Sequence, residues 1–473
     1  MVDVRQQPDP AVPPDPTRRP DPTASGTADG TERTASGTST RLPRALRPFR
    51  HRDYRLLVVS MGASLFASGV WLLAIVWQVI GLGGGPTALS AVTASASAGL
   101  LVSVLIGGVA ADRLPRRAVL LAVESVRIAA ASVATALALT GTLGVWHLAV
   151  IAFVIGAAEA FYFPAYSALL PTLLPAGELL AANGVEQTLR PVAMQAAGPA
   201  LAGVLVGAFI PGAGLLAAAV GYALALLPLL WIRIAPPGGT VADLSGHPTG
   251  TDPAGSGAPR EEETRRSVLA DLREGFAYLL RTGWLSASLA FALLYVLLII
   301  GPIEVLLPFA VRDRADGGPG GYAVVLAAYG VGGALGSIAV ASRRLPRRYL
   351  TTMLLLWGAG ALPLMALGLT TRIWLMATAA FLVGATGAGA MVIWGTLLQR
   401  RVPARLLGRV SSLDFFVSLA LMPVSMALAG PIGAAIGIPT TFVVAGALPV
   451  VLAVAAITLW RLPRDEAAHP LTT

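Results

Sequence analysis

Residues 112–117 read Asp-Arg-Leu-Pro-Arg-Arg, and residues 343–348 read Arg-Arg-Leu-Pro-Arg-Arg. Each copy directly follows a long apolar run. Two further pairs recur at almost the same offset, namely Leu169-Leu170 with Leu397-Leu398 and Ala197-Gly198-Pro199 with Ala429-Gly430-Pro431. One short match could be chance, but three at nearly equal spacings predict that the chain is a duplication whose two halves run in the same direction.

The composition is that of a protein surrounded by lipid. Mean hydropathy is +0.72, and only 12% of the residues are charged, which is too little polar surface for a soluble globule. A membrane-spanning helix needs about 20 largely apolar residues. Unbroken apolar runs of this kind lie at 55–80, 87–110, 118–140, 146–170, 185–209, 212–233, 284–310, 320–342, 349–370, 373–398, 411–436 and 439–460. We therefore predict an all-α membrane protein with 12 transmembrane helices in two parallel six-helix repeats.

The placement of arginine predicts the orientation of these helices. The net charge of +9 would suit a nucleic-acid partner, but it is carried by arginine alone, in clusters between the apolar runs. Such clusters are expected on cytoplasmic flanks, so the expected partner is the lipid bilayer and not nucleic acid. The connectors 81–86, 140–145 and 209–212 carry no arginine. The pattern predicts a multi-pass protein of the bacterial inner membrane with both termini in the cytoplasm.

The polar segments divide the chain into five parts. Residues 1–48 begin with a Pro-, Thr- and Ser-rich stretch and are expected to be a disordered cytoplasmic tail. No apolar run precedes Leu56, so we expect no signal peptide. The other parts are a six-helix bundle at 49–233, a cytoplasmic linker at 234–283, a second bundle at 284–461 and a cytoplasmic tail at 462–473. Within the linker, Ser267 to Trp284 suits either an amphipathic helix on the membrane surface or a solvated connector.

Several motifs resemble those of the major facilitator superfamily. The stretch Gly108-Val-Ala-Ala-Asp112-Arg113-Leu-Pro115-Arg116-Arg117 is similar to that family's loop between spans two and three, with Pro115 where the family usually has glycine. Phe163-Pro-Ala-Tyr166, Gly198-Pro199 and Leu407-Gly408-Arg409-Val410-Ser411-Ser412 resemble the branch that holds macrolide-efflux proteins and the enterobactin exporter. The resemblance covers residues 49 to about 435. It implies the major facilitator fold and proton-driven export of bulky amphipathic compounds.

The resemblance also implies a gate on the cytoplasmic side. A carboxylate and several guanidinium groups at the rim can form exchangeable ion pairs that hold one bundle against the other. By this resemblance, Asp112 should meet the start of the eleventh span near Gly408 and Arg409. The expected gate residues are Gly108, Asp112, Arg113, Arg116, Arg117 and Arg409.

Gly198, Pro199 and Gly203 in the fifth span partly match the family's antiporter motif. Glycines allow close helix approach, and Gly203 with Gly207 has the Gly-xxx-Gly spacing of a packing face. Proline can kink the helix. Generic helix packing explains this stretch as well as antiport does, so both interpretations stay open.

Ionisable residues inside apolar runs are costly and are candidates for function. Glu159 lies in the fourth span and Glu304 toward the outer end of the seventh, and the resemblance implies that spans one, four, seven and ten line the cavity. A carboxyl group in an apolar surrounding can take up and release a proton near neutral pH. Tyr162 and Tyr166 share a helix face with Glu159, which suits a lipophilic cation, although aromatic packing around a hydrogen-bonded acid fits as well.

Glu124 and Arg127 lie three residues apart in the third span and can pair on one face. We favour a structural pair over a proton relay. Glu186, Arg190 and Asp414 are placed near the cytoplasmic ends of spans five and eleven, where gating or interfacial placement fits them. Related drug antiporters often carry an acid in the first span and an arginine in the fourth. Here, the first span reads Ala67-Ser68-Gly69 and has no acid. The fourth reads Ile151-Ala-Phe-Val-Ile-Gly156 and has no arginine.

The residues favour a secondary transporter, expected to be a monomer that exports a bulky amphipathic compound against inward proton flow. Import or facilitated passage of a small metabolite is the alternative, but the spans hold few Asn, Gln or acid–base pairs that a sugar would need. A membrane-embedded enzyme is remote, because the four histidines are scattered. There is no cysteine for thiolate metal sites and no lysine for a Walker loop. We therefore expect no metal and no cofactor, with the proton gradient as the energy source.

Overall fold

The computed structural model describes residues 44–232 and 276–471, without the side chains of 44–46, 105–113, 176, 180, 404, 405, 407–409 and 412. Within this part of the chain, 12 helical spans are long and apolar enough to cross a membrane. The predicted number of spans is therefore confirmed. Their ends lie within a few residues of the predicted ones, and the largest extension is at the seventh, which continues to Ala315.

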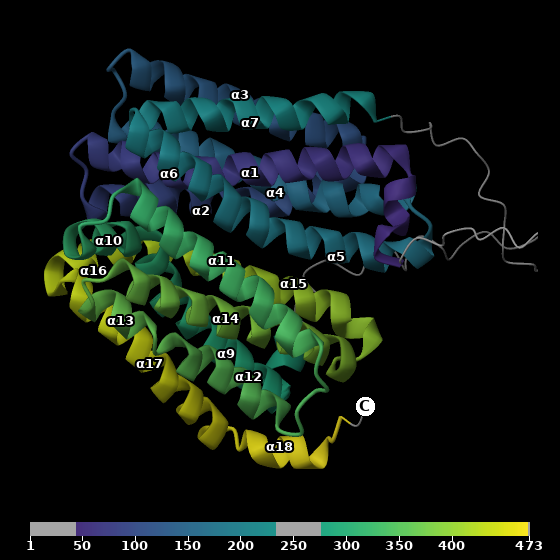
Figure 1. Cartoon of the computed structure of the whole chain (residues 1–473). Coiled ribbons are helices and arrows are strands. Elements are labelled where there is room, and N and C mark those ends of the chain that lie inside the picture. The colour runs from purple at the N-terminus through teal and green to yellow at the C-terminus, as the bar shows by residue number, and fades with distance from the viewer. Residues whose placement is uncertain (1–43, 233–275, 472–473) are drawn as a thin grey trace, which may run out of the picture. The chain divides into compact units, whose positions relative to one another are not determined.

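The first bundle contains the helices up to residue 231 (Figure 1). Its elements are η1 (Arg44–Arg50), α1 (Arg52–Gly81), α2 (Pro86–Arg113), α3 (Arg116–Leu139), α4 (Val145–Leu173), η2 (Ala176–Glu178), α5 (Leu179–Arg190), η3 (Pro191–Ala197), α6 (Gly198–Ala208) and α7 (Pro211–Trp231). The segment α5–η3–α6 forms a single span.

The second bundle contains the helices from residue 283 onward (Figure 1). Its elements are α9 (Gly283–Gly301), η5 (Pro302–Leu306), α10 (Leu307–Ala315), α11 (Pro319–Ala341), α12 (Tyr349–Gly358), η6 (Ala359–Ala361), α13 (Leu364–Leu369), α14 (Ile373–Arg401), α15 (Ala404–Ala420), α16 (Met422–Ile436), α17 (Ile438–Leu459) and α18 (Leu462–Ala468). Each of α9–η5–α10 and α12–η6–α13 forms one span.

Within each repeat, glycines allow the second and fourth spans to pack closely. In the first bundle, α2 packs on α4, and a Cβ added at Gly156 would lie 1.9 Å from the carbonyl oxygen of Ala96. In the second bundle, α11 packs on α14, and a Cβ added at Gly384 would lie 2.1 Å from the carbonyl oxygen of Tyr329. Such contacts are possible only without a side chain, so the second and fourth spans of each repeat cross at backbone distance.

Two spans change from α- to π-helical geometry at a proline. η3 begins at Pro191 and η5 at Pro302. Proline has no N–H to donate and its ring crowds the preceding turn, which a wider turn relieves. Next to η5, the hydroxyl of Ser425 accepts a hydrogen bond from the N–H of Gly301 (2.8 Å) and donates one to the carbonyl of Leu297 (2.7 Å). The hydroxyl thus lies between two groups that would bond each other in an α-helix.

The two bundles contact each other through α2 with α16 and through α6 with α11. The N–H of Gly430 donates to the hydroxyl of Ser90 (2.7 Å), and a Cβ added at Gly203 would lie 2.9 Å from the Cβ of Ala323. Ser90 and Ala323 follow the connectors 81–86 and 316–318, at the ends of α2 and α11 that we call the arginine-poor side. At the opposite side lie the connector 114–115, which Arg113, Arg116 and Arg117 flank, and the connector 342–348, which carries four arginines; we call it the arginine-rich side.

The linker is only partly described. Of the predicted amphipathic helix at 267–284, residues 276–281 are helical, and a new helix begins at Gly283. The remainder of that helix and residues 1–43 of the predicted disordered tail 1–48 lie outside the described residues. The prediction of disorder is wrong for residues 44–48, which begin the helix η1. After α17, the chain continues as helix α18, and Glu466 of α18 accepts hydrogen bonds from the backbone and hydroxyl of Thr351 at the start of α12 (2.8 and 2.9 Å). These bonds tie the end of the chain to the ninth span.

Candidate functional site

A cavity of about 270 Å³ lies among helices of both bundles. Helices α1, α2 and α4 form most of its wall, and η5, α11 and α16 contribute Glu304, Tyr322 and Met426. Most of the lining is apolar or aromatic, and the ionisable side chains among it are Arg127, Glu159, Arg190, Glu304 and the tyrosines. A mostly apolar cavity with a few polar groups is typical of a small-molecule site.

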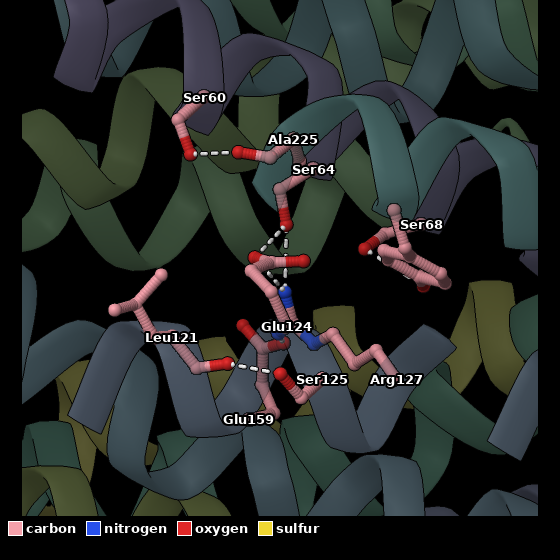
Figure 2. Close-up of polar contacts among 10 residues, drawn as sticks. Ser60, Ser64, Ser68, Leu121, Glu124, Ser125, Arg127, Glu159 and Ala225 are labelled. Carbon is pink, nitrogen blue, oxygen red and sulfur yellow. Dashed lines mark hydrogen bonds and ion pairs between the residues drawn. The ribbon is translucent and has the colours of Figure 1, made fainter. Parts of the chain in front are cut away.

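Arg127 of α3 holds together side chains from three helices (Figure 2). Its side chain is only 2% exposed. One terminal nitrogen donates to the hydroxyl of Ser64 on α1 (2.7 Å) and to Oε1 of Glu124 on α3 (3.3 Å). The other donates to Oε2 of Glu159 on α4. We call Glu124, Arg127 and Glu159 the acid–arginine cluster.

Two aromatic rings complete the surroundings of the guanidinium group. Its carbon lies 5.0 Å from the ring centre of Tyr162 and 5.6 Å from that of Tyr222. The hydroxyl groups of Tyr222 and Ser68 are 3.2 Å apart. Cation–π contacts of this kind are strongest when the cation is removed from water, as it is here. The rings and carboxyl groups therefore stabilise a permanent positive charge inside the span.

The two carboxyl groups of the cluster differ in exposure. The side chain of Glu124 is fully buried, and its Oε1 accepts a hydrogen bond from Ser64 (2.7 Å). The side chain of Glu159 is 40% exposed and lines the cavity. When both are ionised, one guanidinium faces two negative charges, and a single added proton makes the cluster neutral. Glu159 is the member of the cluster that the cavity can reach.

Glu304 is a second carboxyl group in the cavity. It lies in the π-helical turn η5, and Tyr322 lines the cavity with it. Within the described part of the chain, no hydrogen bond or ion pair to its carboxyl group is found. A carboxyl group without a partner inside a membrane span is costly, which makes Glu304 a candidate for binding a proton or a cation.

The predicted stripe of Glu159, Tyr162 and Tyr166 divides between two environments. Glu159 and Tyr162 line the cavity, whereas Tyr166 packs in an apolar cluster with Tyr54 and Leu57. The rings of Tyr162 and Tyr166 stack with their centres 6.3 Å apart. Spans one, four and seven line the cavity as the resemblance implies, but the tenth contributes none of the described lining residues.

The expected gate is only partly described. The side chains of Gly108, Asp112, Arg113 and Arg409 lie outside the described residues, so the predicted contact of Asp112 with the eleventh span stays a prediction. Arg116 is exposed. Arg117 donates to the carbonyl oxygens of Leu229 (3.0 Å) and Leu230 (2.7 Å). It thereby caps the end of α7, where a cation is favoured by the helix dipole.

The antiporter-like stretch packs on both sides of the fifth span. A Cβ added at Gly198 would lie 2.5 Å from the carbonyl oxygen of Phe66 in α1, and Pro199 contacts Gly69. Gly203 faces α11 of the second bundle. A Cβ added at Gly207 would meet no atom within 4 Å, so the prediction that Gly203 and Gly207 form one packing face is wrong for Gly207. The stretch thus serves close packing within one bundle and between the two.

The remaining rim residues have local partners. Arg190 pairs with Glu186 one turn earlier (3.5 Å) and also lines the cavity. Asp414 accepts a hydrogen bond from the indole of Trp394 (3.0 Å). Among the described residues, no group of three or more His, Asp or Glu side chains could hold a metal ion.

Sequence reasoning missed the serines that reach the cluster. Ser60, Ser64 and Ser68 recur every four residues in α1 and bond to Ala225, the acid–arginine cluster and Tyr222 (Figure 2). This spacing places the three serines on one helix face. A polar stripe of this kind in an apolar span is the sequence pattern from which their role could have been predicted. No sequence pattern indicated the link between Arg127 and Glu159, because the two residues lie on different helices and 32 positions apart in sequence.

Comparisons with known proteins show the family to which the chain belongs. The family model of the Major Facilitator Superfamily matches residues 56–418. The multidrug efflux pump Tap of Mycolicibacterium fortuitum is 28% identical over 414 residues, which are 85% of this chain and 95% of Tap. Macrolide efflux protein A of Streptococcus pyogenes is 24% identical over 401 residues, covering 83% of this chain and 92% of that protein.

Solved structures of distant sequence share the fold. A POT family transporter in complex with 5-aminolevulinic acid superposes with a TM-score of 0.63 at 15% identity, covering 86% of this chain and 95% of that one. The nucleoside transporter NupG gives a TM-score of 0.62 at 12% identity, covering 86% and 98%. The chain belongs to the Major Facilitator Superfamily and is a membrane transporter rather than an enzyme.

Proposed function

We propose that this transporter exports bulky amphipathic compounds in exchange for protons that enter the cell, with its arginine-rich side in the cytoplasm. The observation that carries the proposal is the acid–arginine cluster, in which two carboxyl groups share one guanidinium group and one of them opens into the cavity. The efflux relatives support the direction of transport, and the apolar wall supports an apolar substrate.

The coupling follows from charge balance. A proton bound at Glu159 removes one of the two negative charges that face Arg127 and loosens the link between α3 and α4. Release of the proton restores the link. Because the cavity is bounded by both bundles, a change at its wall can favour one relative position of the bundles over the other. A bulky compound needs more room than about 270 Å³, so it enters when the bundles part at one side.

The test is a proteoliposome assay with a pH gradient and a pH-sensitive dye. We expect a lipophilic cation such as ethidium, or a macrolide such as erythromycin, to dissipate the gradient in vesicles that contain the wild-type chain. Glu159→Gln should reduce this dissipation at least tenfold, and Glu304→Gln should reduce it as well. Glu178→Gln is the matched control, because Glu178 pairs with His51 (3.1 Å) and does not line the cavity.

Three results would count against the proposal. Unchanged dissipation of the pH gradient in both cavity variants would exclude Glu159 and Glu304 as proton sites. An equal loss of dissipation in the Glu178 control would point to a general structural effect. Substrate movement that ignores the pH gradient would favour facilitated passage instead.

Orientation is tested separately by cysteine labelling, for which the natural chain provides a cysteine-free background. Leu82→Cys, in the connector of the arginine-poor side, should react with a membrane-impermeant maleimide added to intact cells. Ser342→Cys, in an arginine-rich connector, should react only after the cells are opened. The reverse pattern would invert the proposed direction.

A further inference from the structure

A second cavity, of about 630 Å³, lies on the arginine-rich side and within the second bundle alone. It is bounded by the end of α11, the connector 342–348, α12 and α14, and α11 and α14 lie side by side (Figure 1). None of its lining residues belongs to the central cavity. We refer to it as the connector pocket.

The connector pocket carries positive charge without an acidic lining residue. Arg343, Arg344 and Arg400 line it, and the described lining includes no Asp or Glu. Arg343 and Arg344 are exposed, and within the described residues no hydrogen bond or ion pair from either guanidinium group is found. The hydroxyl groups of Ser342, Thr352 and Thr396 also line the pocket. Guanidinium and hydroxyl groups together form a donor set for an oxyanion.

The internal repeat shows how this charge arose. The connector 112–117 and the connector 343–348 differ at their first position alone, where Asp112 is replaced by Arg343. The replacement raises the charge of the second connector by two units and removes its own acidic residue. The second connector therefore has no acidic residue of its own to balance its four arginines.

The remaining lining is apolar. Leu345 and Pro346 of the connector belong to it, and the helices that span the membrane contribute Val340, Ala341, Leu356, Val392 and Ile393. The pocket thus has basic groups at the level where the apolar spans end and an aliphatic wall toward the membrane. Basic pockets between helices at this level suit the headgroups of anionic lipids, and a volume of about 630 Å³ exceeds what a bare oxyanion would occupy.

We propose that the connector pocket binds the phosphate group of an anionic membrane lipid, with Arg343 and Arg344 as its ligands and the aliphatic wall against the glycerol and acyl portion. The planar guanidinium group can bind two phosphate oxygens at once. Occupancy of the pocket would join α11, α12 and α14 at the arginine-rich side. The proposal does not depend on the proposed transport function.

The test measures thermal stabilisation of the purified full-length chain in detergent on titration with dioleoyl phosphatidylglycerol. Wild type should show a saturable rise in melting temperature, and Arg343→Gln/Arg344→Gln should weaken the apparent affinity at least tenfold. The matched control is Arg347→Gln/Arg348→Gln, which removes the same charge from the same connector at residues that do not line the pocket. The control should bind as wild type does.

Further arms distinguish the possible ligands. Dioleoyl phosphatidylcholine, which has no net charge, and inorganic phosphate should each stabilise the wild type at least tenfold less well than phosphatidylglycerol. Thr396→Phe fills the pocket without a change of charge and should also weaken lipid binding, so the result does not rest on one variant. Equal loss in the control pair, equal stabilisation by inorganic phosphate, or unchanged binding in the Arg343/Arg344 variant would overturn the assignment.

Discussion

Arg127 is the residue on which the candidate site depends. It is buried inside a membrane span and is balanced by Glu124 on its own helix and by Glu159 on α4. Such a charge persists in a low-dielectric surrounding only when its partners remain in place. The structural pair predicted for Glu124 and Arg127 is therefore one half of a larger arrangement, whose other half opens into the cavity.

We expect Arg127→Gln to be more damaging than the double variant Glu124→Gln/Arg127→Gln. The single change leaves the buried Glu124 without its cation, and breaking a buried pair in this way costs about 3–5 kcal/mol. The double change removes both charges and should recover at least about 1 kcal/mol of that loss. Unfolding of the purified variants by titration with sodium dodecyl sulfate measures both. A double variant less stable than the single would show that Glu124 does not depend on Arg127 for its charge balance.

Among the helical elements, η5 places Glu304 in the cavity. The side chain of Ser425 bonds to the backbone of α9 directly before η5. Ser425→Ala would remove the hydroxyl that bridges the N–H of Gly301 and the carbonyl of Leu297, and the loss of a hydrogen bond of this kind costs about 0.5–1.5 kcal/mol. We expect lower stability together with weaker substrate-driven dissipation of the pH gradient. Ser337→Ala is the control, since Ser337 bonds only within its own helix. Equal effects of the two variants would mean that the bridge to η5 has no special role.

The crossing of α2 and α4 makes a second prediction for an element. Gly156→Ala would place a Cβ 1.9 Å from the carbonyl oxygen of Ala96, so the two backbones must move apart. Overpacking of this kind costs about 1–3 kcal/mol, and the melting temperature should fall. Gly207→Ala, at a glycine with open space around it, should leave the melting temperature unchanged. A similar fall in both variants would indicate that helix propensity, and not the crossing, decides the effect.

For the whole molecule, transport by alternating access requires that the contact between α6 and α11 opens. A Cβ at Gly203 would lie 2.9 Å from the Cβ of Ala323, within reach of a disulfide after a shift of about 1 Å. We expect Gly203→Cys/Ala323→Cys to lose at least tenfold in transport when oxidised and to regain it on reduction. The single variants are the controls, and the cysteine-free chain adds no background. Full transport by the oxidised, cross-linked protein would contradict motion at this contact.

Much of the fold could be predicted because its determinants are local. Lipid demands that each crossing segment satisfy its own backbone hydrogen bonds, so about 20 apolar residues in a row are enough to locate a span. The 12 spans follow from this rule alone. The duplication is also visible in the residues, since Asp112–Arg117 and Arg343–Arg348 follow equivalent spans. The ends of the spans are less predictable from apolar runs, because a helix can continue past the last apolar residue, as α10 does through Arg312 and Arg314.

The site was only partly predictable for the opposite reason. The residues alone identified Glu124, Arg127, Glu159 and Glu304 as costly in lipid, and the three-residue spacing of Glu124 and Arg127 gave their pair. Only the tertiary structure decided that Arg127 also reaches Glu159, that Ser64 joins them, and that Tyr166 packs away from the cavity. Spacing along a helix determines which side chains share a face, but the crossing of helices, set here by glycines such as Gly156, determines what that face meets.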